Sequence, residues 1–326
     1  ARAPRPGRGQ RVGAMAALGD PPVPAERQER TAHGALAPVA YVPLRPAEPG
    51  APVPGRGRPR SGGRGAEETR AVHLKAGTVP NAAGSAYMEQ GNTKVVAAVF
   101  GPRQAGERAQ KESTAEGILS VELQFAAFCS RRCGKEENEK RGALYGAMLQ
   151  RALESVVLLE RYSKTIFDIH LLVLEDDGGA LTAALSAASL ALADAQVEMR
   201  DLATGATVHL AAGAEGKAGA LLLDCDAEEE RLLPEGSAVL HLGLCPARDG
   251  LCLLHSAGPL PAGPFEQMVL VAKETAAAVG AEVRRCLERR VQRRAVKRAR
   301  GEAEAEAEAG EEPPEHEADG AMMEDG

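Results

Sequence analysis

One stretch constrains the fold of this chain more than any other: GSAYMEQGNTKVVAAVFGPR, residues 84–103. Two extended segments flank Gly91-Asn92, a two-residue connection in which glycine supplies the positive φ of a tight turn, so the stretch predicts a β-hairpin. The second segment is apolar on both faces, which predicts a central strand covered on both sides and ended by Pro102. Its apolar residues are Val95, Val96, Val99 and Phe100.

Two later segments have a helical pattern. Apolar residues recur at spacings of three and four between residues 139 and 161, as in an amphipathic helix. The second segment, ALTAALSAASLALADA at 180–195, is dense in alanine and serine. Because small side chains let a helix backbone lie close to a sheet, we expect the second helix to be the most buried one.

The other regular segments alternate with these helices and predict an α/β core over residues 72–298. Further strands are predicted at 119–128, 165–174, 207–211, 220–225, 238–245 and 251–256, and a last helix at 264–298. We divide the chain into a Pro/Gly/Arg-rich disordered extension, the two halves of the core and a disordered acidic tail. These four parts are residues 1–65, 66–205, 206–298 and 299–326.

Charge is unevenly placed around a net value of −7. The end of the last helix, residues 284–300, is strongly basic, and no Lys or Arg occurs from residue 302 onward. A short basic cluster of this kind is compatible with three roles: a nuclear localisation signal, contact with RNA, or pairing with the acidic tail beside it. The composition does not choose between them.

The six cysteines form neither a disulfide-dense framework nor paired CxxC motifs, which favours a reducing, intracellular compartment. Cys129 and Cys133 lie four residues apart without a nearby histidine or second cysteine pair, so we interpret them as buried or loop thiols. We predict no metal site, no cofactor and, since no apolar run reaches about 18 residues, no contact with a membrane.

Two long motifs resemble those of one known family. Residues 84–103 resemble the opening hairpin of RNase PH-like proteins, and LEDDGGALTAALSAASLALADAQVEMRDL, residues 174–202, is similar to that family's D-G-G loop, helix and following strand. LLLDCDAEEE, residues 221–230, stands where the family carries a pair of acidic residues, and RSGGR, residues 60–64, resembles its R-x-D-G-R lead-in. Within this family the chain looks most like the RNA exosome ring subunits of the type called mRNA transport regulator 3.

The resemblance implies a fold, an assembly and a place in the cell. The fold is the RNase PH fold, ribosomal protein S5 domain 2-like, with mixed sheets packed against helices. The implied assembly is a hexameric ring around a channel for single-stranded RNA. The implied partners are other RNase PH-like ring subunits and cap subunits bearing OB and KH domains. The implied location is the nucleus and nucleolus, and also the cytoplasm.

Phosphorolysis needs fixed cations for the phosphate, usually arginines, and an acidic side chain near the leaving oxygen. Active family members place one arginine directly after D-G-G-T. Here Leu181 occupies that position and Ala180 replaces the hydroxyl residue. Arg141 aligns with the family's other phosphate-binding arginine. Because losing one such contact typically costs roughly 10² to 10³ in rate, the resemblance implies a family member that is not an enzyme.

The acidic positions and the channel residues are also implied by the resemblance. Asp224 matches the first acidic position and Glu230 the second, with Glu229 as the alternative; they are either a vestigial acid or metal site or a solvated acidic turn. Arg131 and Arg132 lie where related subunits carry basic residues of the RNA channel, and with Arg141 they are our RNA-binding candidates. The predicted function is a non-catalytic exosome ring subunit supporting 3′–5′ RNA processing and decay; the alternative is an active phosphate-dependent exoribonuclease.

Overall fold

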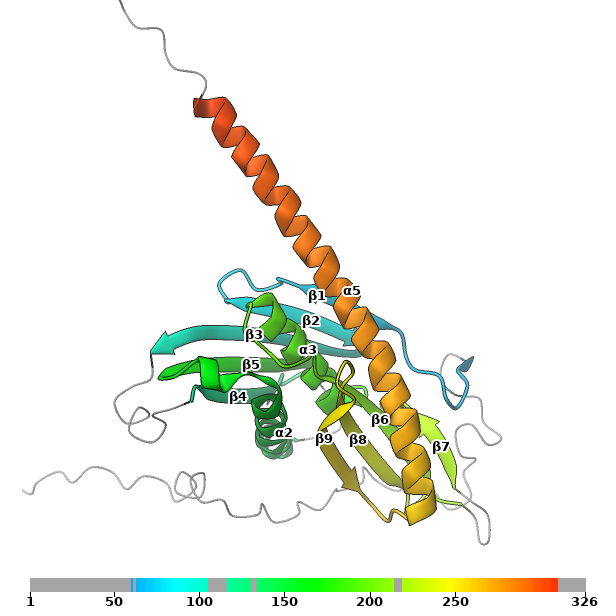
Figure 1. The fold of residues 1–326 in the computed structure, drawn as a ribbon. Helices are drawn as coiled ribbons and strands as arrows, with labels where there is room; N and C mark the ends of the chain where they lie inside the picture. Colours follow the sequence, from blue (N-terminus) through cyan, green and yellow to red (C-terminus); the bar gives the residue numbers. More distant parts are fainter. Residues whose placement is uncertain (1–59, 61–62, 105–115, 130–133, 214–218, 310–326) are drawn as a thin grey trace, which may run out of the picture. The chain divides into compact units, whose positions relative to one another are not determined.

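A computed structural model of the chain describes residues 60, 63–104, 116–129, 134–213 and 219–309. These residues form two sheets and the helices that pack on them (Figure 1). The first sheet has the strand order β1-β2-β3-β5-β4, with bounds Val72–Ala76, Gly84–Gln90, Thr93–Gln104, Thr165–Glu175 and Ile118–Phe125. The second has the order β7-β6-β8-β9, with bounds Ala220–Leu223, Thr204–Ala211, Ala238–Cys245 and Gly250–Ala257.

The predicted hairpin is confirmed. Strands β2 and β3 pair antiparallel from Gln90↔Thr93 outward, and Gly91 between them has a φ of 58°. Two details of the prediction are wrong. Phe100, on the outer face of β3, is 37% exposed, so that face is not covered. The strand also continues past Pro102 to Gln104, because a register irregularity between Phe100 and Arg103 accommodates a residue that cannot donate to the ladder.

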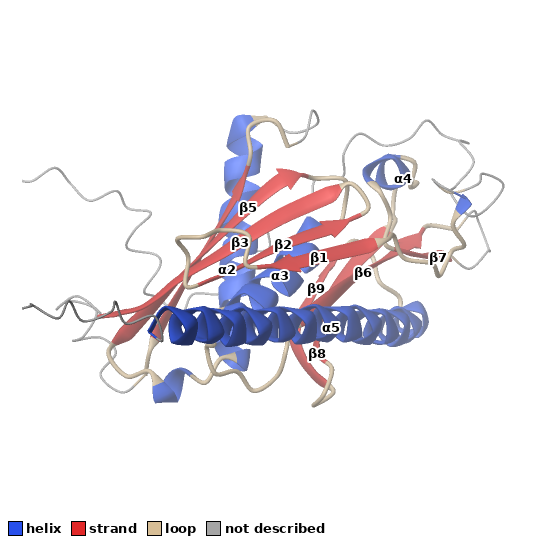
Figure 2. Ribbon diagram, turned by 90° about the horizontal axis from the view of Figure 1, so that it is seen from above, coloured by secondary structure: helices blue, strands red, loops and turns tan. Residues whose placement is uncertain are grey.

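Helix α3, Ala180–Asp194, is the most buried helix, as the alanine and serine content predicts. It packs on β2 and β3 of the first sheet and on β6 of the second, so it lies between the two sheets (Figure 2). Serine hydroxyls join the layers: the backbone N–H groups of Ala203 and Gly205 donate to Ser189 and Ser186. The large core therefore contains the inner face of the first sheet and nearly all of α3.

The second sheet is covered on its other face by α5, Ala262–Ala309. Apolar side chains of β6 and β8 meet one stripe of this helix, formed by Met268, Ala272 and Ala276. Strand β6 is buried along its whole length because α3 covers one face and α5 the other. Helix α2, Lys135–Val156, lies against β4 and β9, and a short 3₁₀ turn follows at Leu159–Arg161.

Three predicted boundaries are wrong. Helix α2 ends at Val156 rather than 161, because Val157 is extended and bridges to Met199. The last helix continues beyond 298 to Ala309, so residues 299–309 of the predicted disordered tail are helical; their alternating Glu and Ala are strong helix formers. Arg60, placed in the disordered extension, is buried and bonded into the core. Residues 1–59, 61–62 and 310–326 lie outside the described residues. No described helix is long and apolar enough to cross a membrane.

Candidate functional site

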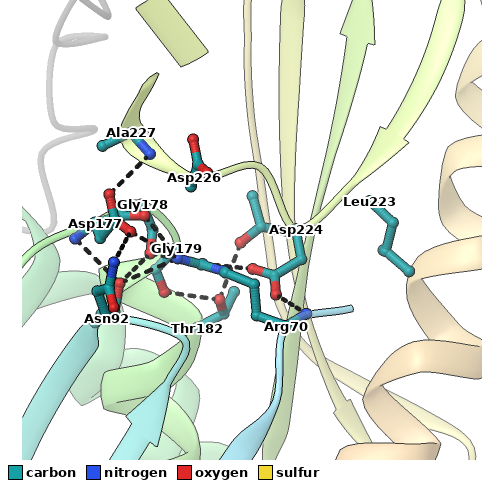
Figure 3. A network of polar contacts seen from close by, with 12 residues as sticks. Arg70, Asn92, Asp177, Gly178, Gly179, Thr182, Leu223, Asp224, Asp226 and Ala227 are labelled. Atoms are coloured by element: carbon teal, nitrogen blue, oxygen red, sulfur yellow. Dashed lines mark hydrogen bonds and ion pairs between the residues drawn. The ribbon is translucent and has the colours of Figure 1, made fainter. Parts of the chain in front are cut away.

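The D-G-G loop, Asp177-Gly178-Gly179, connects β5 to α3 and is fixed from below by Arg70 (Figure 3). The guanidinium of Arg70 donates to the carbonyl oxygens of Asp177 at 2.6 Å and Gly178 at 3.0 Å. The hydroxyl of Thr93 donates to the Gly178 carbonyl as well, at 2.7 Å. Glycine is required at 178, where φ is 93° and a Cβ would lie 2.5 Å from the carbonyl oxygen of Cys225. The loop is therefore held rigidly against the acidic segment.

Asp224 is the carboxylate partner of Arg70. Its Oδ1 accepts from the guanidinium at 2.6 Å and its Oδ2 from the Arg70 backbone N–H at 2.9 Å. The side chain is 2% exposed. Burial alone would raise the pKa of Asp224, but the bonds from Arg70 outweigh burial and lower it. Both oxygens of this predicted vestigial acid therefore stabilise the junction between β1, the D-G-G loop and β7.

The next acidic residues form the short helix α4, Ala227–Arg231, and its cap. Asp226 caps the helix through a capping box with Glu229. The buried guanidinium of Arg60 donates to both carboxylate oxygens of Glu229, at 3.0 and 2.9 Å, and also to the carbonyl oxygen of Leu223. The arginine outweighs burial and lowers the pKa of Glu229. Glu229, the alternative second acidic position, is thus a structural counter-ion of Arg60.

Glu230 pairs with a buried histidine. Its Oε1 lies 3.4 Å from Nε2 of His209, and this distance is an ion pair when the imidazole is protonated. Among the described residues neither ring nitrogen of His209 makes a hydrogen bond. Burial lowers the pKa of a histidine, but Cys225 and Glu230 outweigh it here and raise the pKa of His209 to about 10. The acidic segment is therefore not a solvated turn, because Asp224, Glu229 and Glu230 each face a buried cation.

A second polar chain crosses from α3 to the second sheet. The hydroxyls of Thr182 and Thr207 are 2.9 Å apart, and Thr207 is 3.1 Å from Nδ1 of His241. His241 stacks on His255 with ring centroids 5.9 Å apart. Burial, together with the charge of His209, lowers the pKa of His241 to about 3, so this imidazole is neutral. These groups satisfy one another and connect the start of α3 to β6 and β8.

Leu181 occupies the position at which the resemblance implies an arginine. Its side chain is 1% exposed and belongs to the large apolar core. The sequence shows that the arginine is missing, and the structure adds that its replacement points into the core. Ala180 beside it is also buried. Neither residue offers a charge or a hydroxyl to an anion at this end of α3.

Arg141, the implied second phosphate-binding arginine, lies on α2 near the same loop. Its guanidinium donates to Oδ2 of Asp176 at 2.9 Å and sits over the rings of Phe125 and Tyr145, 4.7 and 5.6 Å from their centroids. Burial opposes its charge, but Asp176 and Tyr145 outweigh burial and raise its pKa. The arginine is thus charged and fixed at the edge of the site. Arg131 and Arg132, like Cys133, lie outside the described residues.

The residues that the sequence analysis missed are Arg60, Arg70 and His209. Arg60 belongs to the R-S-G-G-R lead-in, within a segment whose composition predicts disorder. Arg60 and Arg70 are buried against carboxylates 169 and 154 positions away, and His209 is buried against Glu230, 21 positions away. The sequence shows only that each of these basic residues lies in or near a strand, and that pattern is too common to identify a buried ion pair.

Comparison with known proteins identifies the family of the chain. Residues 68–198 match the model of the 3′ exoribonuclease family, domain 1. The chain is 35% identical over 233 residues to a protein of Thermococcus gammatolerans named exosome complex component Rrp41, covering 71% of this chain and 89% of that protein. It is 33% identical over 229 residues to the exosome complex component RRP41 homolog of Arabidopsis thaliana, covering 70% of this chain and 91% of that protein.

A solved structure supports the fold. The crystal structure of rice (Oryza sativa) Rrp46 has a TM-score of 0.57 and 23% identity, and the match covers 68% of this chain and 97% of that one. The subunit type suggested by the resemblance, mRNA transport regulator 3, stays a prediction. The matched family model, the extent of the relatives and the fold agree with the resemblance seen in the sequence. The chain belongs to the RNase PH-like 3′ exoribonuclease family.

Proposed function

We propose that this protein is a non-catalytic structural subunit of an RNA exosome ring, which supports 3′–5′ RNA processing and degradation carried out by other subunits. Its relatives are named exosome complex components, and they match most of its length. Its partners in this proposal are other RNase PH-like ring subunits, cap subunits with OB and KH domains, and single-stranded RNA in the channel. The nucleus, the nucleolus and the cytoplasm are the proposed locations.

One observation carries the non-catalytic part of the proposal: Leu181 is buried in the core where the family's phosphate-binding arginine is implied. The transition state of phosphorolysis accumulates charge on phosphoryl oxygens, and an apolar side chain turned inward cannot stabilise that charge. The ion pairs of Asp224 and Glu230 support the same conclusion. Arg70 and His209 already compensate the charges of these carboxylates, which lowers their affinity for a magnesium ion.

The alternative is an active phosphate-dependent 3′–5′ exoribonuclease. Three observations favour it: Asp224 and Glu230 are retained, and Arg141 remains charged beside the D-G-G loop. Such an enzyme would hold the phosphate with Arg141 and backbone N–H groups alone. The two proposed functions therefore differ in one property: only the exoribonuclease would release nucleoside diphosphates in a phosphate-dependent reaction.

Activity distinguishes them directly. The purified chain is incubated with an oligoadenylate and Mg²⁺, with and without inorganic phosphate, beside an active RNase PH-like enzyme as positive control. We expect no nucleoside diphosphate in either reaction of this chain. Release that requires phosphate, and that an Arg141→Gln variant loses, would establish the alternative. Affinity purification of the tagged chain tests the assembly: recovery without other RNase PH-like subunits would contradict the structural role.

A further inference from the structure

The later part of α5 is strongly basic. Residues 284–298 contain seven arginines and one lysine against a single glutamate. The inner half of the helix packs on the second sheet. The basic part first passes β1 and the end of α3, where Cys286 and Leu287 pack against the large core, and the helix then extends beyond the sheets (Figure 1). The helical backbone sorts the basic residues into rows, because residues four apart lie nearly above one another.

One row faces the protein. Arg290 Nε donates to Oδ1 of Asp194 at 3.1 Å, and Arg294 Nη2 lies 2.8 Å from the same oxygen. Asp194, at the end of α3, has a side chain that is 2% exposed. These two arginines fasten the helix to α3. Their charge is used within the protein and is not available to a partner.

A second row faces outward. Arg285, Arg289 and Arg293 are all exposed, and the sequence continues their spacing with Lys297. Arg285 donates a short hydrogen bond, 2.5 Å, to Glu282 on the helix surface. No carboxylate of the described residues lies within ion-pair distance of Arg289 or Arg293. At a rise of 1.5 Å per residue the row presents a cation about every 6 Å along a straight rod.

The chemistry of this row fits a polyanion better than a folded protein surface. The exposed apolar residues on this part of the helix, Val291 and Val296, are five positions apart and so lie on different faces. They form no apolar stripe of the kind that a protein partner would bury. Arginine is a strong donor to phosphate oxygens, and a regular array of arginines suits a chain of phosphates.

We propose that the outward row of α5, Arg285, Arg289 and Arg293, binds the phosphate backbone of single-stranded RNA. The row contains no aromatic side chain, so the contact has no stacking component and does not depend on base sequence. This inference goes beyond the role in the ring and does not depend on the absence of catalysis. It assigns RNA contact to an element remote from the D-G-G loop.

The test measures binding of a fluorescein-labelled 20-nucleotide oligouridylate to the full chain by fluorescence anisotropy across a range of salt concentrations. An Arg285→Gln, Arg289→Gln, Arg293→Gln variant should lower the slope of log K against log salt by about 2, since each phosphate contact on a single strand contributes roughly 0.7. Affinity at 0.1 M salt should fall about tenfold or more. Glutamine is a good helix former, so α5 should persist, as checked by circular dichroism.

Two further variants make the result specific. Arg161→Gln, Arg200→Gln, Arg248→Gln removes the same charge from exposed positions elsewhere and should leave the slope unchanged. Replacing the three α5 arginines by lysine should leave the slope of log K against log salt at its wild-type value. The proposal is overturned if wild type does not bind, if both glutamine variants lose affinity equally, or if neither does. It is also overturned if a labelled polyglutamate peptide, and not RNA, binds through the row, since the partner would then be an acidic protein segment.

Discussion

Arginines occupy opposite environments in two regions of this molecule. Arg60 and Arg70 are buried at the junction of the two sheets, each bonded to a carboxylate and to backbone carbonyls. Arg285, Arg289 and Arg293 stand exposed along α5. A buried ion pair is costly to break because the remaining charge stays out of water, whereas an exposed charge adds little to stability and stays available to a partner. Arginine therefore stabilises the junction of the two sheets, whereas on α5 its charge remains accessible to a partner.

A third buried arginine at the position of Leu181 tests whether the first region has room for another cation. We expect Leu181→Arg to cost more than about 4 kcal/mol in the free energy of unfolding, because a charge would enter an apolar core without a free carboxylate. Chemical denaturation measures this, with Leu181→Met as the volume-conserving control. A variant that folds with wild-type stability would show that the position can still direct an arginine toward the D-G-G loop.

Breaking the existing pair should have the next largest effect. Arg70→Met leaves Asp224 buried without its cation and should cost about 3–5 kcal/mol. Arg103→Met, which removes the exposed partner of Asp168, should cost less than about 1 kcal/mol. Denaturation midpoints of the two variants compare a buried pair with an exposed one. Equal losses would contradict the structural role assigned to Asp224.

The pair of His209 and Glu230 predicts a pH dependence. The pKa of His209 is raised to about 10 in the folded protein, above the value near 6.5 expected in the unfolded chain. Its contribution to stability is therefore complete below pH 6.5 and is lost as the pH rises toward 10. The melting temperature of wild type should fall over this interval in the presence of a reductant, and that of His209→Gln should fall less. The exposed His73→Gln serves as control; parallel curves for His209→Gln and wild type would argue against the ion pair.

The smallest effect on stability is expected at the outward row of α5. Arg289→Gln should change the free energy of unfolding by less than about 0.5 kcal/mol, because the side chain is exposed and makes no ion pair with a described residue. Thermal denaturation beside Arg290→Gln, which loses a bond to buried Asp194, provides the comparison. If Arg289→Gln proves the more destabilising of the two, the division of α5 into an inward and an outward row is wrong.

Local pattern was sufficient to predict much of the fold. The hairpin at Gly91, the burial of α3 and every described strand except β1 follow from turn chemistry, side-chain size and alternation along short segments. The edge strand β1, Val72–Ala76, was not predicted. The continuation of α5 to Ala309 was missed because an acidic composition was taken as disorder, although glutamate and alanine favour a helix.

The site was less predictable because its contacts join distant parts of the chain. The resemblance identifies Leu181 and Asp224. It does not predict the ion pair between Asp224 and Arg70, because these two residues are 154 positions apart. Likewise, the composition of the Pro/Gly/Arg-rich segment does not distinguish Arg60 from its neighbours, and the lead-in motif does not indicate its partner Glu229, 169 residues away. Sequence patterns report local periodicity, and long-range ion pairing has none.

The long separation of these pairs also orders events during synthesis. Arg60 and Arg70 leave the ribosome well before Asp224 and Glu229, and at 5–20 residues per second the interval is roughly ten to thirty seconds. The strands of the first sheet are complete by Glu175, so that sheet can form while both arginines still lack their carboxylate partners. The order of synthesis therefore allows the first half to fold before its amino-terminal lead-in is bonded to Asp224 and Glu229. Final closure awaits a five-residue helix, α4, near residue 230.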